Sequence, residues 1–252
     1  MTDYVIGFAV AMFIALTGVG AGTITVPVLV LFLGVPAAEA VAIGLMFSAV
    51  IKLVLVPAQV ARGNVAWRTL GVMVMGGAPG VLLGSLALSH LVGTGSKAAV
   101  NGLLGVILIA TAGWQIAYSF RTPREAGGGR DRRGVLGWLM LPVGLEVGFS
   151  SAGAGALGSA ALLGLTTLAP AQVVGTDIVF GFLLSLLGSG AHGFAHGAGS
   201  SLLWHLIAGG VLGAGAGTML STVVPRRPLR FALWVWLMAL GGQFLFSSIA
   251  AR

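Results

Sequence analysis

The sequence predicts an all-α integral membrane protein with about eight hydrophobic segments, arranged in two similar four-segment halves. Hydrophobic residues make up 57% of the chain and charged residues only 8%, whereas a soluble domain carries about 25% charged residues. Two of the apolar stretches are about 30 residues long, although a straight membrane helix needs only about 20. Both long stretches contain closely spaced glycines, and they lie at corresponding positions in the two halves.

Short loops join the segments, except at one point near the middle of the chain. Residues 121–134 contain three consecutive glycines and five arginines, a composition typical of a solvated linker. The chain therefore divides into an N-terminal transmembrane repeat (1–120), this linker and a C-terminal transmembrane repeat (135–252). The eight segments span 4–33, 37–60, 69–91, 98–120, 135–165, 170–195, 202–222 and 229–249.

Each long segment is predicted to form two half-helices joined by a glycine-rich break inside the membrane. A broken backbone loses hydrogen bonds, and the membrane tolerates this only where the break is buried in protein or lines a wet cavity. Such breaks direct helix N-termini, with their free N–H groups, at an anionic ligand. Two alternatives stay open: glycines that only let helices pack closely, and one long tilted helix in each half.

The two halves also repeat in sequence. A shift of 133 residues aligns glycines of the two halves in the same order. It places Gly20, Gly22, Gly80 and Gly84 on Gly153, Gly155, Gly213 and Gly217. Paired interrupted segments at corresponding positions in two halves are the sequence feature that indicates a transporter binding site.

The positions of the basic residues help to choose a topology. If all eight segments cross the membrane, the loop and terminal basic residues split eight against four between the two sides. If both long segments instead enter and leave on the same side, the split becomes ten against two, which the positive-inside rule prefers. The second topology leaves three full crossings in each half, an odd number, and so predicts inverted repeats.

These repeated blocks resemble the sulfite exporter TauE/SafE family of bacterial membrane transporters. That family has a glycine-rich motif near the start of each half, followed by a proline loop and a motif similar to A-V-G-T-S. The first copies here read Gly18-Val19-Gly20-Ala21-Gly22 and Ala40-Val41-Ala42-Ile43-Gly44, and the second read Ser151-Ala152-Gly153-Ala154-Gly155 and Val173-Val174-Gly175-Thr176-Asp177. The resemblance implies a multi-pass protein of the bacterial inner membrane that exports sulfite, a related sulfur oxyanion or an organosulfonate.

The two breaks supply the predicted substrate-binding groups. Backbone N–H groups and neighbouring hydroxyls can bind an oxyanion without a full countercharge, although each hydroxyl could instead bond to its own helix backbone. Lys52 lies within the second segment, where it could contact the anion, pair with Asp177 or Glu146, or extend to the membrane interface. The predicted binding residues are Gly20, Gly22, Thr23, Ser151, Gly153, Gly155 and Lys52.

Four titratable residues are candidates for proton coupling. Asp177 lies several residues inside an apolar segment, where a carboxylate is costly unless it is paired or wet. Glu146, just before the second break, could hold a coupling ion or form a structural salt bridge. His192 and His196 would share one face if their helix continues that far, and could relay protons or simply form a polar hinge.

Several functions are excluded or less favoured. The chain has no cysteine, which rules out thiol catalysis and cysteine-bound metals, and no cofactor or metal site is expected. It has no G-x-x-x-x-G-K-[ST] motif, so this subunit does not use ATP, and no aromatic-interleaved basic patch for nucleic acid. A passive anion channel is the main rival to a coupled exporter. An intramembrane enzyme using Ser150 or Ser151 with His192 or His196 is less favoured, as is a scaffold. The expected partners are the lipid bilayer and a small inorganic or organosulfur anion, and the small-residue helix faces would also allow a homo-oligomer.

Overall fold

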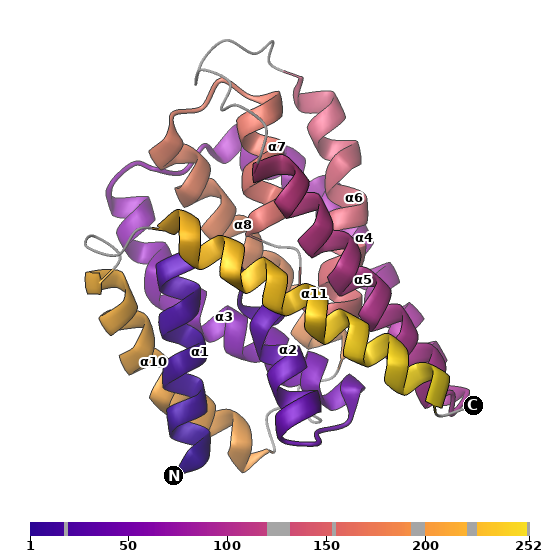
Figure 1. Ribbon diagram of the computed structural model, residues 1–252. Helices are drawn as coiled ribbons and strands as arrows, with labels where there is room; N and C mark the ends of the chain where they lie inside the picture. Colours follow the sequence, from indigo (N-terminus) through magenta and orange to yellow (C-terminus); the bar gives the residue numbers. More distant parts are fainter. Residues whose placement is uncertain (18–19, 120–131, 153–154, 193–199, 221–225, 251–252) are drawn as a thin grey trace.

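The computed structural model (Figure 1) describes residues 1–17, 20–119, 132–152, 155–192, 200–220 and 226–250. These residues form ten helices and no strand, which confirms the all-α prediction. The helices are α1 (Thr2–Thr17), α2 (Ala21–Phe32), α3 (Ala37–Ala61), α4 (Trp67–Gly93), α5 (Lys97–Ser119), α6 (Arg133–Ser150), α7 (Ala156–Leu165), α8 (Pro170–Ala191), α10 (Ser201–Leu220) and α11 (Arg226–Ala250).

Six of these helices are long and apolar enough to cross a membrane, so the protein is a multi-pass membrane protein. They are α3, α4 and α5 before the arginine-rich linker and α8, α10 and α11 after it. The remaining four helices belong to the two long segments, and at 10 to 18 residues each is shorter than the usual membrane helix of about 20 residues.

Each long segment consists of two helices separated by a break in the backbone. Between α1 and α2, Gly20 has a non-helical conformation with φ −57° and ψ 142°. At the second break, Ser151 ends α6 in the left-handed region at φ 60°, and Gly155 precedes α7 at φ 127°. The conformation of Gly155 is open in practice only to glycine, which explains why the helix is interrupted there.

Glycine stripes join the halves through two tight helix pairs, α4 with α6 and α1 with α10. A Cβ atom added to any of these glycines would meet the backbone of the facing helix. The pairs use matching positions, because a shift of 133 residues converts one set of contacts into the other. Gly76, Gly80 and Gly84 face Gly137, Leu141 and Leu145, whereas Gly209, Gly213 and Gly217 face Tyr4, Phe8 and Met12.

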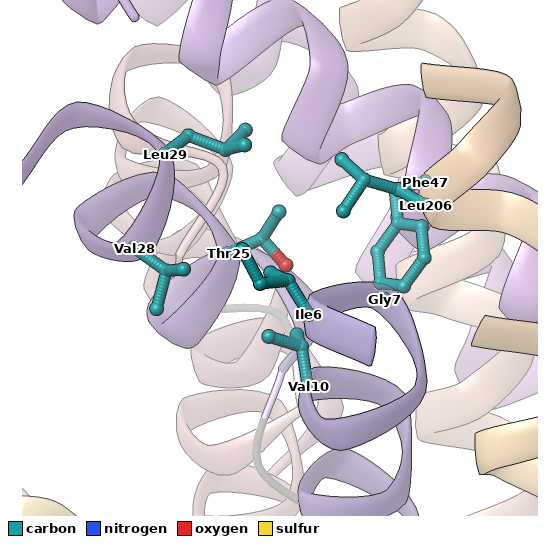
Figure 2. Close-up of a pocket in the computed structure, with 8 residues that line it drawn as sticks. All are labelled: Ile6, Gly7, Val10, Thr25, Val28, Leu29, Phe47 and Leu206. Atoms are coloured by element: carbon teal, nitrogen blue, oxygen red, sulfur yellow. The ribbon is translucent and has the colours of Figure 1, made fainter. Parts of the chain in front are cut away.

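The centre of the molecule is the contact between α3 and α8, the two spanning helices with the largest buried share. Helices α5 and α11 pack against each other and cross the front of the molecule in Figure 1. The interior between α1, α2, α3 and α10 is apolar, with Thr25 the one residue bearing a side-chain oxygen among the eight that line a small gap there (Figure 2). That gap has no room for a water molecule, so it is packed core.

Candidate functional site

The two breaks meet at the centre of the molecule. Gly22, in the first turn of α2, packs so closely on Ser151 that a Cβ atom would overlap the serine carbonyl group. Gly44 of α3 faces the same residue, and a Cβ there would lie 3.2 Å from the Ser151 hydroxyl oxygen. Two breaks that are far apart in sequence, and the central helix α3, therefore converge on one serine.

Ser151 has the properties of a residue held in place for a ligand. Its N–H donates a 2.8 Å hydrogen bond to the Val147 carbonyl, which ends α6 in the left-handed conformation. Its side chain is buried, yet within the described part of the chain its hydroxyl has no hydrogen-bond partner. A buried hydroxyl without a partner is costly, and an anion arriving at the break would accept its proton.

The helix N-termini at the breaks supply further donors. No described side chain caps either α2 at Gly20 or α7 at Gly155. The first turn of a helix carries free N–H groups and a partial positive charge. The Thr23 hydroxyl donates to the Gly20 carbonyl, which is the backbone-bonding alternative. The hydroxyl proton of Thr23 is thus already used in this conformation.

Asp177 is buried beside the second broken segment. The Ser159 hydroxyl of α7 donates a 2.7 Å hydrogen bond to its Oδ2. Its Oδ1 lies against Gly158, where any Cβ would collide with it, and has no hydrogen-bond partner among the described residues. Only 5% of Asp177 is exposed, so the carboxyl group belongs to the protein interior rather than to the headgroup region.

Lys52 is the cation nearest in role to that carboxylate. It lies on α3, is 9% exposed and interacts electrostatically with Asp177 across the α3–α8 contact. Among the residues that the structure describes, the two form no direct ion pair. One turn away, Ser185 donates a 3.0 Å hydrogen bond to Ser48. Lys52 is therefore an interior charge facing Asp177, which removes the interfacial alternative for this conformation.

The charged groups occupy only one side of the repeat. A shift of 133 residues places Gly44 on Asp177 and Val26 on Ser159. Gly44 and Val26 do touch, because a Cβ atom added to Gly44 would lie 3.0 Å from Val26 Cγ2. The same crossing is therefore apolar in the first half and a hydrogen-bonded carboxylate in the second.

Glu146 lies away from this pair, on the side of α6 that faces α5. Its carboxyl group has the Thr111 hydroxyl of α5 as a partner, while Oε1 is buried without one in the described structure. No described basic side chain forms a salt bridge with it, so the salt-bridge alternative does not hold here. The structure thus separates Glu146 from Asp177.

The histidines are less well placed for a relay. Helix α8 ends at Ala191, and His192 folds back with Nδ1 3.0 Å from the Gly188 carbonyl oxygen. His196 and Gly153 lie outside the described residues. The condition for a shared histidine face, a helix continuing through both residues, is not met by α8 as far as it is described.

Sequence reasoning missed three polar contacts around the centre. Thr176 accepts a 2.9 Å hydrogen bond from the Ala66 N–H, which ties α8 to the loop after α3. The contact of Thr111 with Glu146 and the Ser48–Ser185 pair are the other two. Serine and threonine are common within membrane helices and often bond to their own backbone, so nothing in the sequence distinguishes these residues.

A multi-pass helical protein with two interrupted helices meeting beside buried charges has the architecture of a membrane transporter. The family described as sulfite exporter TauE/SafE matches residues 4–244, and the chain belongs to that family. It is 27% identical over 237 residues to the probable membrane transporter protein YjnA of Bacillus subtilis (strain 168), covering 90% of this chain and 92% of that protein. No solved structure matches the chain. Family and relative both assign membrane transport, rather than catalysis, to this protein.

Proposed function

We propose that the chain is a secondary transporter that exports a small sulfur anion across the bacterial inner membrane, coupled to protons. The substrate class is sulfite, a related sulfur oxyanion or an organosulfonate, in keeping with the family description. The observation that carries the proposal is the meeting of the two breaks at Gly22 and Ser151. A transporter site requires donors that converge from both halves, and this contact brings them together.

We also propose that the two halves are inverted repeats. The matching α4–α6 and α1–α10 interfaces support a two-fold relation between the halves. In Figure 1, α1 begins at the lower end of the molecule and α6 at the upper end, as inversion requires. The three long apolar helices in each half agree with this topology, because an odd number of crossings reverses the second half.

The proposed binding step begins with separation of the breaks. In this conformation Gly22 touches Ser151, so an anion can enter only when the two move apart. The groups then available are the Ser151 hydroxyl and the N–H groups of the first turns of α2 and α7, with Thr23, Gly20, Gly153 and Gly155 completing the breaks. Lys52 adds a full positive charge two turns along α3 from Gly44.

Proton coupling follows from charge balance in the interior. A buried charge that loses its partner is strongly destabilising. Lys52 is balanced by Asp177 in the empty protein. An arriving anion adds a second negative charge, and a proton on Asp177 restores the balance. Glu146 and the two histidines are proposed as further proton-carrying groups, with Glu146 at a separate position beside Thr111.

The test is anion flux in proteoliposomes with an imposed pH gradient. Sulfite, thiosulfate, a short organosulfonate and chloride are compared, with Asp177→Asn beside the native chain. Asp3→Asn is the matched control, because Asp3 lies at the partly exposed start of α1, 3.5 Å from His205. We expect gradient-driven sulfur-anion flux that Asp177→Asn loses and Asp3→Asn keeps. Equal flux with and without the gradient would identify a passive channel, and no flux of any anion would refute the proposal.

A further inference from the structure

A second cavity lies away from the breaks, between α1, α2 and α11. Its volume is about 500 Å³, and every residue that lines it is apolar. Helix α11 crosses in front of α1 and α2 at this point in Figure 1. Phe13 and Phe32 line the cavity and are 41% and 66% exposed, so it opens on the outer surface of the helix bundle.

The position of the cavity along α11 sets its depth in the membrane. The membrane-spanning part of α11 begins at Phe231. Leu229, Ala232, Leu233 and Trp236 line the cavity from the first three turns of the helix. The cavity therefore lies at one membrane surface, where a lipid headgroup meets its acyl chains.

The same end of α11 is strongly basic. Arg226, Arg227 and Arg230 belong to its first two turns, just outside the membrane-spanning part. No acidic residue follows Asp177 in the chain, so nothing within α11 offsets these charges. An apolar cavity beside a cluster of arginines at the membrane surface complements a ligand with an apolar tail and an anionic head.

We propose that this cavity binds an acyl chain of one anionic phospholipid, with the lipid phosphate at the first turns of α11. The tail replaces bilayer contacts along α1 and α2, and the charge of the basic turns selects an anionic headgroup. The site is independent of the transported anion, because it is apolar and separate from Ser151, Lys52 and Asp177. It would attach α11 to the hairpin that carries the first break.

The test is native mass spectrometry of the full chain, incubated with equal amounts of phosphatidylglycerol and phosphatidylcholine that carry the same acyl chains. We expect one retained lipid per chain, predominantly phosphatidylglycerol. Each arginine replaced by glutamine should lower the preference about five-fold, from about 1 kcal/mol per basic residue near a membrane surface. Lys97→Gln, in the first turn of α5, is the matched control and should leave the preference unchanged.

A second variant fills the cavity without changing charge. Ala232→Phe should abolish lipid retention, whereas Leu212→Phe, at a 70% exposed position on α10, should not. Equal retention of both lipids by the native chain would refute the anionic site, as would retention that survives Ala232→Phe. A dimer mass in place of a lipid adduct would assign the cavity to a second copy of the chain and overturn the proposal.

Discussion

Replacing Gly22 with alanine tests the central contact between the two breaks. Gly22 lies in the first turn of α2 in a helical conformation that alanine adopts freely, so backbone strain does not contribute. The new methyl group would overlap the carbonyl group of Ser151. Because that group belongs to the backbone, it cannot rotate away as a side chain would, and the two breaks must separate.

The expected cost can be set by comparison with other glycines. Overpacking a well-packed interior costs about 1–3 kcal/mol, and Gly22→Ala should fall at the upper end. Gly44→Ala should cost less, because its methyl group meets two side chains, with Val26 Cγ2 at 3.0 Å and the Ser151 hydroxyl at 3.2 Å. Gly71→Ala on α4 has open space around it and should be neutral or stabilise by up to about 1 kcal/mol through helix propensity.

The assay is unfolding of the purified chain in detergent micelles, with anion flux in proteoliposomes as a second readout. The expected order of the free energy of unfolding is Gly71→Ala highest, then Gly44→Ala, then Gly22→Ala. Flux should fall in the same order for the two central variants. If Gly22→Ala unfolds like Gly71→Ala, the two breaks do not touch and the proposed site loses its basis.

Three further predictions concern the packing and the buried charges. Gly213→Ala should destabilise α10 against α1 by about 1–3 kcal/mol, while Gly215→Ala on the same helix meets nothing and should not; equal unfolding curves would contradict the packing. Lys52→Met should destabilise more than the double variant Lys52→Met/Asp177→Asn, with a coupling energy of about 0.5–3 kcal/mol in a double-mutant cycle; additive effects would mean that the two charges do not interact. Ser159→Ala removes the donor to Asp177 and should lower the free energy of unfolding by about 1.5–3 kcal/mol, a loss that Asp177→Asn should reduce when the two are combined; unfolding like that of the native chain would contradict it.

The matching interfaces explain how the sequence repeat acts in the fold. The glycine stripes of α4 and α10 could have joined separate chains, yet they pack on α6 and α1 of the same chain. Close backbone contact replaces the hydrophobic effect as the force that associates helices in lipid. The repeat thus records two equivalent helix pairs.

The sequence by itself determined the helices, their approximate ends and the two interruptions. Long apolar runs can satisfy their backbone in lipid only as helices, and the glycines near residues 20 and 155 mark where those helices stop. The tertiary structure decided which of the polar residues meet. Ser151 against Gly22, Ser159 bonded to Asp177, and Glu146 apart from both are contacts between distant segments. Such contacts depend on how helices rotate and cross, and an almost uniformly apolar helix has too weak a pattern to fix its own rotation.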